Sequence, residues 1–465
     1  PPPLSGDYQV PGDYTTLTAA VADYNLRGVS GPTRFLLNNA TYDAGSGETF
    51  PLLISTSGPD TTVTNTLTIQ PNTGVSSTIT GVSTSGIIVI ADQFVTLNGD
   101  NVGGDVARNL MVNNTGTGTN SYVVGFFNLG GTKVARNATV RYSDIRGGVT
   151  AVGTVSWGII LNGGGGDYDN ALIEYNKIWQ AYVGIGHYGV AATGISNNNV
   201  IRNNIIGDAT GSNESIKFRG IEIAQSDGLT ITANDIFGNA AGNSNGQQAG
   251  ILQTTGSSNI TMTRNNIHDF YYTGTGGLGC FGIWLASSSG TINIANNMIH
   301  NIKGDGDVFG TAGTSLHWMP AGIGVGANSA GTVNLDHNSV YMSGATLGPD
   351  FTGQSAAVSI LSGLTGINLR NNILRNSMTT VGAPDAANKA YAVAFVGTGA
   401  ANTAFATTDY NNYLADGVNP HIGFAANADQ TSLASWQTAT AQDASSQDVD
   451  PQFVSTSDLH LSNPL

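Results

Sequence analysis

Two stretches in the second half of the chain carry side chains that could act on a carbohydrate. The first stretch follows Ile267 and the second follows Ile299. Their chemistry-bearing residues are His268, Asp269, Phe270, Tyr271 and Tyr272 in the first, and His300, Lys303, Asp305, Asp307, His317 and Trp318 in the second. Aromatic rings stack on the CH faces of sugars, and a few charged groups then fix the orientation of the ligand. A groove that binds a saccharide or another partner is therefore one interpretation.

We take nine residues as candidate ligand-binding positions. They are Phe270, Tyr271, Tyr272, Trp284, Lys303, Asp305, Asp307, His317 and Trp318. Long loops are where binding residues tend to lie, and the stretch after Ile299 is the longest insertion in the chain. The alternative interpretation is that these aromatic side chains fold down and seal the side of the protein.

A catalytic role for these stretches has definite requirements. A glycoside hydrolase needs two carboxylates facing one cleft. A polysaccharide lyase needs a base near the sugar C5 proton and a cation that neutralises the sugar carboxylate. The segment Gly304–Asp307 has some character of a calcium-binding loop, but two carboxylates are too few ligands for a metal site. We predict no catalytic residue, no metal site and no cofactor, with calcium as an open alternative.

A repeated sequence motif, called a phrase below, is expected to position these stretches. It consists of an apolar residue, two variable residues, an asparagine, a variable residue and an apolar residue, as in Ile173–Ile178. The asparagines are Asn176, Asn204, Asn234, Asn265, Asn297, Asn338, Asn372 and Asn412, and the last copy has Asp409 at its first apolar position. A fixed phrase with a variable spacer is typical of stacked coils whose loops differ in length.

A second phrase precedes each asparagine phrase. It is a small residue followed by an apolar, a variable and an apolar residue, as in Gly220–Ile223 and Gly282–Leu285. Alternation with period two predicts short strands with one buried face, whereas no window sustains a helical period. The pattern predicts an all-β fold, a parallel β-helix of roughly a dozen coils stacked ~4.8 Å apart.

We expect the asparagines to form a ladder inside the coils. Each lies just past a strand, where the chain must turn, and Asn tolerates the left-handed backbone region better than most residues. Its amide both donates and accepts hydrogen bonds, so amides stacked from coil to coil satisfy one another. This structural role is preferred over a ligand-binding role.

The two ends of the chain depart from the repeat. Leu17, Ala20, Val21 and Tyr24 share one face of a predicted helix that would cover the first coil. A second short helix is predicted at Ser432–Thr440. The predicted segments are 1–100, an N-terminal helical cap with the first coils; 101–414, the regular coils; and 415–465, a closing segment.

Composition excludes several classes of function. The chain has 465 residues and a net charge of −15, which argues against binding nucleic acid or an anionic membrane surface. A single cysteine, Cys280, excludes an internal disulfide, and no stretch approaches the ~20 apolar residues of a membrane span. We therefore expect no nucleic acid partner and no membrane insertion.

The phrases resemble a known architecture. The asparagine phrases, the Gly-Ile-x-Leu phrases such as Gly158–Leu161 and the N-terminal helix resemble the right-handed parallel β-helix of the pectate-lyase-like superfamily. The resemblance is closest to large secreted or surface-anchored β-helix proteins of Gram-negative bacteria, and Asp450–Phe453 and Asp458–Leu461 resemble their closing segment. It implies export and an extracellular location. It does not define an activity, because the family includes lyases, hydrolases and adhesins.

One row of side chains predicted to face solvent carries almost no ionisable group. The middle residues of the second phrase are Ile160, Gly186, Glu222, Leu252, Trp284, Gly324, Ser359 and Ala394. The leading hypothesis is thus a secreted, non-catalytic β-helix protein for cell-surface structure, adhesion or extracellular self-assembly, whose partners are further copies of itself or surface glycans. The alternative is a polysaccharide lyase or glycoside hydrolase acting in the loops of residues 268–318.

Overall fold

The computed structural model describes most of the chain, as two compact units. The described residues are 1–103, 107–130, 133–149, 153–162, 167–190, 195–208, 214–241, 247–273, 279–287, 289–304, 319–326, 331–345, 353–361, 363–380, 386, 388–425 except 397–403, and 427–462. Unit 1 comprises residues 1–217 and 221–235, and unit 2 comprises residues 218–220 and 236–465. The three segments predicted from the sequence are a different division, which stays a prediction.

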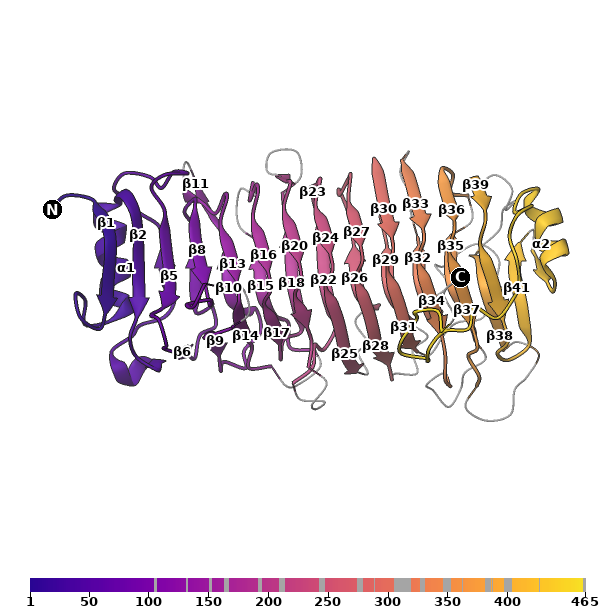
Figure 1. Cartoon of the computed structure of the whole chain (residues 1–465), viewed down its shortest axis with the longest axis horizontal. Helices are drawn as coiled ribbons and strands as arrows, with labels where there is room; N and C mark the ends of the chain where they lie inside the picture. Colours follow the sequence, from indigo (N-terminus) through magenta and orange to yellow (C-terminus); the bar gives the residue numbers. More distant parts are fainter. Residues whose placement is uncertain are drawn as a thin grey trace. The chain divides into compact units, whose positions relative to one another are not determined.

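Unit 1 consists of stacked coils whose strands form three parallel sheets, named A, B and C (Figure 1). Sheet A contains β1 (Leu4–Val10), β2 (Val29–Leu37), β5 (Leu67–Pro71), β8 (Val95–Asn98), β13 (Thr139–Arg141), β16 (Leu172–Glu174), β20 (Val200–Arg202) and β24 (Thr230–Thr232). Sheet B contains β3 (Thr41–Tyr42), β6 (Ser77–Gly81), β9 (Leu110–Asn114), β14 (Ser143–Arg146), β17 (Lys177–Trp179) and β21 (Ile205–Ile206). Sheet C contains β4 (Leu52–Ile54), β7 (Ile88–Ile90), β10 (Ser121–Phe126), β15 (Ser156–Leu161), β18 (Val183–Tyr188) and β22 (Arg219–Ala224), the last from Ile221 onward.

Unit 2 has sheets of the same three kinds (Figure 1). Its A strands are β27 (Thr261–Thr263), β30 (Thr291–Ala295), β33 (Thr332–Asp336), β36 (Ile367–Arg370) and β39 (Phe405–Asp409). Its B strands are β25 (Asp235–Ala241), β28 (Asn266–Tyr272), β31 (Met298–Lys303), β34 (Ser339–Met342), β37 (Ile373–Asn376) and β40 (Asn412–Ala415). Its C strands are β26 (Gln248–Gln253), β29 (Cys280–Leu285), β32 (Ala321–Val325), β35 (Gln354–Leu361), β38 (Lys389–Val396), β41 (Pro420–Ala425) and β42 (Ala428–Gln430), and only β42 pairs antiparallel.

Short elements lie outside these sheets. They are the antiparallel pair β11 (Asn128–Gly130) and β12 (Lys133–Val134), the parallel pair β19 (Ser196–Asn197) and β23 (Ser226–Asp227), the 3-10 turn η1 (Ala44–Ser46), and the helices α1 (Leu17–Arg27) and α2 (Leu433–Thr440). Helix α1 begins where the Thr16 side chain accepts a hydrogen bond from the Ala19 N–H at 3.0 Å, and it packs against β1, β2 and β4. Its role as a cap of the coils stays a prediction.

The apolar residues of the repeat pair with their equivalents one coil away. On the A strands of unit 1, Val140 pairs with Ile173, Ile173 with Ile201 and Ile201 with Ile231. All four side chains are buried. Since each coil adds one apolar residue to the same interior row, the core grows by stacking. The predicted parallel β-helix is confirmed.

The recurrent asparagines are buried and bonded from coil to coil. In unit 1 the Asn176 amide donates to Asn204 Oδ1 at 3.0 Å, and the Asn204 amide donates to Asn234 Oδ1 at 3.0 Å. In unit 2 the same bond runs from Asn265 to Asn297, Asn297 to Asn338 and Asn338 to Asn372, at 2.9–3.0 Å. Amides of both units also donate to a backbone carbonyl, as Asn176 does to Val140 at 2.9 Å and Asn338 does to Ile294 at 2.8 Å.

The last asparagine of this column is Asn411, and the assignment of Asn412 was wrong. The Asn372 amide donates to Asn411 Oδ1 at 3.0 Å, whereas Asn412 Oδ1 accepts from the Val449 N–H at 3.1 Å. The pairing of β36 with β39 contains a register shift that places Thr408 opposite Leu369. The last copy of the asparagine phrase therefore begins at Thr408, one residue before the predicted Asp409.

The left-handed backbone belongs to the residue before each column asparagine. Positive φ angles between 50° and 59° occur at the preceding residue of all nine copies, counting Ser143 as the first. These residues are Tyr142, Tyr175, Asn203, Ala233, Arg264, Asn296, His337, Asn371 and Tyr410. The bend turns the chain from an A strand to a B strand, and the following amide is thereby directed inward. The expectation that the asparagine itself takes this conformation was wrong.

A buried histidine makes unit 1 sensitive to acid. His187 of β18 is fully buried, with Nε2 2.7 Å from the Asn199 amide nitrogen, and burial lowers its pKa to about 4. In the unfolded chain the pKa is about 6.5. As pH falls below about 6.5 the unfolded chain binds a proton that the folded chain rejects, so stability is lost until about pH 4.

We expect protonation of His187 to lower the unfolding free energy of unit 1 by about 3 kcal/mol between these two pH values. Urea unfolding of the wild type and of His187→Met across this pH range measures that loss. The His187→Met variant should show a shallower loss of unfolding free energy on acidification, whereas His460→Asn, at an exposed site in unit 2, should keep the wild-type slope. Equal slopes in all three proteins would contradict the prediction.

Candidate functional site

A row of ring-bearing and cationic side chains projects from the B strands of unit 2. Each member lies three residues after a column asparagine. The row consists of Phe237, His268, His300, Tyr341 and Arg375. The strand register pairs His268 with His300, His300 with Tyr341, and Tyr341 with Arg375. Because strand residues alternate between faces, this row points away from the buried Ile267 and Ile299.

The rings of this row form a continuous stack at its beginning. The Phe237 and His268 rings have centroids 4.8 Å apart and planes 5° from parallel, and the His268 and His300 rings have the same geometry. Parallel strands one coil apart impose this spacing. The stack holds the two imidazoles in fixed orientations, which is what a proton-transfer group requires.

The Asp269 carboxylate accepts hydrogen bonds from three side chains near these imidazoles. The residue takes positive φ, at 58°, which bends β28 and brings the carboxylate beside its neighbours. Its oxygens accept hydrogen bonds from His268 Nδ1 at 2.7 Å, from the Tyr271 hydroxyl at 2.8 Å, and from the Asn301 amide. Burial alone would raise the pKa of Asp269, but these three bonds outweigh it and hold the pKa well below its usual range. The carboxylate is therefore ionised at neutral pH.

Tyr271 and Lys303 stand together on paired positions of β28 and β31. The Lys303 ammonium lies 5.1 Å from the centre of the Tyr271 ring, within the range of a cation–π contact. Burial, followed by the hydrogen bond to Asp269, raises the pKa of Tyr271. The phenol thus keeps its proton over the ordinary pH range.

These groups border a cavity of about 340 Å³. Its lining consists of Asp269, His300, Asn301, Lys303, Tyr341, Ser343, Gly344, Ser377, Thr456 and Ser457. The volume lies at the lower end of the ~300–1,000 Å³ that small-molecule sites occupy. The lining brings together the His300 ring, whose two nitrogens are buried, the Lys303 ammonium, the Asp269 carboxylate and a set of hydroxyl and amide groups.

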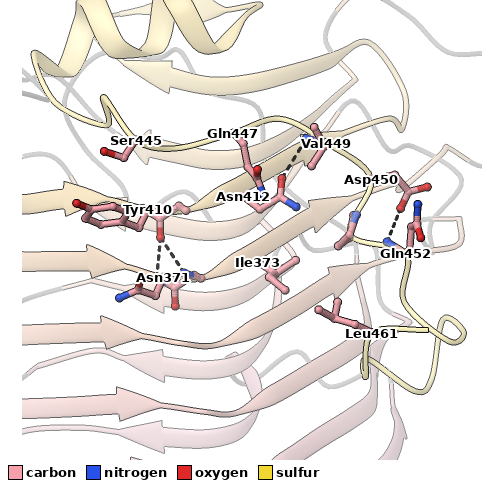
Figure 2. Close-up of a pocket in the computed structure, with 13 residues that line it drawn as sticks. Asn371, Ile373, Tyr410, Asn412, Ser445, Gln447, Val449, Asp450, Gln452 and Leu461 are labelled. Carbon is pink, nitrogen blue, oxygen red and sulfur yellow. Dashed lines mark hydrogen bonds between the residues drawn. The ribbon is translucent and has the colours of Figure 1, made fainter. Parts of the chain in front are cut away.

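A larger cavity of about 640 Å³ also lies in unit 2 (Figure 2). It is bordered by the turns between β36 and β37 and between β39 and β40, and by the C-terminal segment. Its walls include Asn371, Tyr410, Gln447, Asp450 and Gln452. The Asp450 carboxylate pairs with Arg375 Nη1 at 3.1 Å. The described lining contains no imidazole and no second carboxylate, so it offers no pair of proton-transfer groups. The smaller cavity is the better candidate for catalysis.

The predicted ligand-binding residues lie in different environments. Tyr271 and Lys303 lie at the smaller cavity, whereas Phe270 and Tyr272 are buried on the inward side of β28 and cannot reach a ligand. Asp305, Asp307, His317 and Trp318 lie outside the described residues.

Apart from the half-buried Glu222, the row that was predicted to face solvent from the C strands is buried, which corrects the prediction for Trp284. The Trp284 side chain is only 4% exposed and packs in an apolar cluster with Phe281, Leu252, Tyr391 and Ala394. Small residues at neighbouring positions of this row, such as Gly324, leave room for the indole ring. Burial of both faces is typical of parallel strands that carry continuous apolar runs.

Several residues of the cavity were not predicted to bind a ligand. The sequence marks His268, Asp269 and His300 as chemistry-bearing residues but gives them no binding role. It does not point to Tyr341, Ser377, Thr456 or Ser457. A usable signal was present, because the row lies at a constant offset of three residues from the column asparagines. Among the described residues, no three His, Cys, Asp or Glu side chains gather to hold a metal ion. Within the same residues, no helix has the length and apolarity to cross a membrane.

Comparison with known proteins extends only to the fold. No protein-family model matches the sequence, and no curated protein sequence matches it. Among solved structures, the A-module of the mannuronan C-5 epimerase AlgE6 of Azotobacter vinelandii is similar, at 12% identity over 95% of this chain and 98% of that chain, with a TM-score of 0.52. A DFA-IIIase from Arthrobacter chlorophenolicus A6 in complex with DFA-III matches at 11% identity, over 90% and 92% of the two chains, with a TM-score of 0.40. An alginate lyase from Paenibacillus sp. str. FPU-7 matches at 10% identity, over 84% and 94%, with a TM-score of 0.32.

These findings correct the leading hypothesis of a non-catalytic protein for surface structure, adhesion or self-assembly. The solved structure with a TM-score of 0.52, which is matched over nearly all of both chains, is named as an enzyme, a mannuronan C-5 epimerase. The hypothesis also rested on one row of the C strands, whereas the chemistry-bearing groups around the cavity belong to the B strands. At such low identity the likeness shows the fold alone: the chain is a right-handed parallel β-helix.

Proposed function

We propose that the chain is a polysaccharide lyase that cleaves a uronate-containing polysaccharide in the cavity beside His300 and Lys303. The observation that carries the proposal is the convergence of His300, Lys303 and the Asp269 hydrogen-bond centre on one cavity. Uronate polymers are extracellular, which fits the export that the resemblance implies. A glycan partner is also consistent with the epimerase of the same fold, whose name specifies mannuronan.

In this mechanism the Lys303 ammonium pairs with the carboxylate of the sugar and so acidifies the C5 proton. The His300 imidazole takes that proton, the electron pair forms the C4–C5 double bond, and the bond from C4 to the leaving oxygen breaks. The resulting imidazolium returns the proton to the leaving oxygen, so atoms and charge balance. Asp269 acts as a positioning residue, because it fixes His268, which stacks on His300.

Glycoside hydrolysis is less well supported by the same cavity. A hydrolase requires a carboxylic acid and a second carboxylate at a defined separation. Asp269 is the carboxylate that lines the described part of the cavity, and its three hydrogen bonds favour the ionised form, so it is a poor acid. The imidazole and ammonium fit elimination better than hydrolysis.

The test is incubation of the full chain with alginates, pectates and other glycuronans, with neutral glycans as the control. Ultraviolet absorbance reports the unsaturated product, and NMR in D₂O reports exchange of the C5 proton even without cleavage. Because the net charge is −15, turnover of a polyanion should rise as moderate salt screens the repulsion. No product and no C5 exchange with any acidic glycan would refute the proposal.

A lysine pair provides a matched test of the role of Lys303. Lys303→Met should reduce turnover by about 10²–10³-fold, because the developing charge on the sugar carboxylate loses its partner. Lys389→Met removes a lysine of β38 whose ammonium pairs with Asp429 at 2.6 Å, and it should leave turnover unchanged. A similar loss in both variants would point to general charge effects instead.

A further inference from the structure

The C-terminal residues 450–462, called the C-terminal hairpin, fold back on themselves. Phe453 and Leu461 form an antiparallel bridge, and the Val454 N–H donates to the His460 carbonyl at 2.9 Å. At the tip, the Ser455 hydroxyl accepts from the Asp458 N–H at 2.9 Å. The hairpin is thus a defined element with its own hydrogen bonds.

The hairpin is anchored to the row that forms the candidate site. The Phe453 ring lies 5.8 Å from the Tyr341 ring. Arg375 donates to Asp450 at 3.1 Å and to Asp416 at 2.7 Å, and its guanidinium lies 4.8 Å from the centre of the Tyr341 ring. Leu459 of the hairpin is buried. Arg375 therefore serves as an anchor, because both of its terminal nitrogens are held by protein carboxylates.

These contacts hold the hairpin against Tyr341 and Arg375, and Tyr341 lines the cavity together with His300. Thr456 and Ser457 at the hairpin tip line the same cavity as His300 and Lys303. Figure 2 shows Ser445, Gln452 and Leu461 of the C-terminal segment beside the larger cavity.

We propose that the C-terminal hairpin closes one end of the substrate groove, so that the enzyme acts on chain ends and not on internal segments. This inference rests on the proposed function. A groove open at both ends admits an internal segment, whereas a wall admits only a terminus. The hydroxyls of Thr456, Ser457, Ser343 and Ser377 supply hydrogen-bond partners for the hydroxyls of a terminal sugar.

The first experiment compares two measures of cleavage by the wild-type chain on long alginate and pectate. Unsaturated product should accumulate from the start as short oligosaccharides, while the viscosity of the polymer falls slowly. A rapid fall in viscosity with long intermediate products would overturn the inference and leave the proposed function intact. If neither cleavage nor binding of short oligouronates is detected, both the inference and the proposed function are overturned.

The second experiment releases the hairpin with the double variant Asp450→Asn, Phe453→Ala. Its product distribution should shift toward internal cleavage, and its affinity for long polymer should increase by roughly tenfold, since the steric exclusion is gone. Limited proteolysis of residues 450–462 verifies release. Val454→Ala, at a side chain of the same hairpin that is 54% exposed, should retain the wild-type products. An unchanged product distribution in a released, folded double variant would overturn the inference.

Discussion

Replacing His300 with glutamine is expected to reduce turnover of an acidic polysaccharide by about 10²–10⁴-fold. The imidazole is the group placed to take the C5 proton, and the amide of glutamine has a similar length but no basic nitrogen. The Asp269 centre and Lys303 remain in the variant, so binding of the substrate should change much less than turnover. Steady-state kinetics with separate kcat and KM values measure the two effects.

The control for this prediction is His337→Asn. His337 lies in unit 2, is exposed, and takes positive φ, at 58°, which asparagine tolerates well. It should keep wild-type kinetics. Since His300 is buried, thermal unfolding of His300→Gln verifies that the fold persists. If a folded His300→Gln variant keeps more than about a tenth of the wild-type kcat, another residue is the base.

Asn338→Ala is expected to destabilise unit 2 by about 3–5 kcal/mol. The Asn338 amide donates to Ile294 at 2.8 Å and to Asn372 at 3.0 Å, and its oxygen accepts from both the backbone and the side chain of Asn297. Alanine leaves two buried donors of Asn297 without an acceptor in the coil interior. The unfolding free energy from urea titration measures the loss.

Asn334→Ala is the matched control for Asn338→Ala, four residues away in the same coil. Asn334 also stacks with asparagines of neighbouring coils, donating to Asn293 and accepting from Asn368, both at 2.8 Å. It is only part-buried, so water replaces the lost partners and the cost should stay below about 1 kcal/mol. Equal losses of unfolding free energy in the two variants would contradict the expectation that burial makes Asn338 more important than Asn334.

The candidate site was only partly predictable. The aromatic and charged residues after Ile267 and Ile299 stood out by composition, but Trp284 and Phe270 were assigned to a solvent-facing site although both are buried. Strand register decides the face on which Phe270 lies, whereas Trp284 is buried because apolar side chains such as Phe281 and Leu252 pack around it. The row that lies three residues past the column asparagines of unit 2 follows a constant spacing, so the sequence contains the signal for it.

The coils follow from the residue pattern alone, because period-two apolar phrases and the recurrent asparagine are local patterns with one stable way to stack. The helix that carries Trp436 also begins after Ser432, as the sequence predicts. Which chemistry-bearing residues come together depends instead on the packing of distant segments. Asp269 and Thr456 border one cavity although they are far apart in the chain, since stacking and the folded-back hairpin bring them together. No local pattern encodes that meeting, because it depends on strand register and on where the last residues pack.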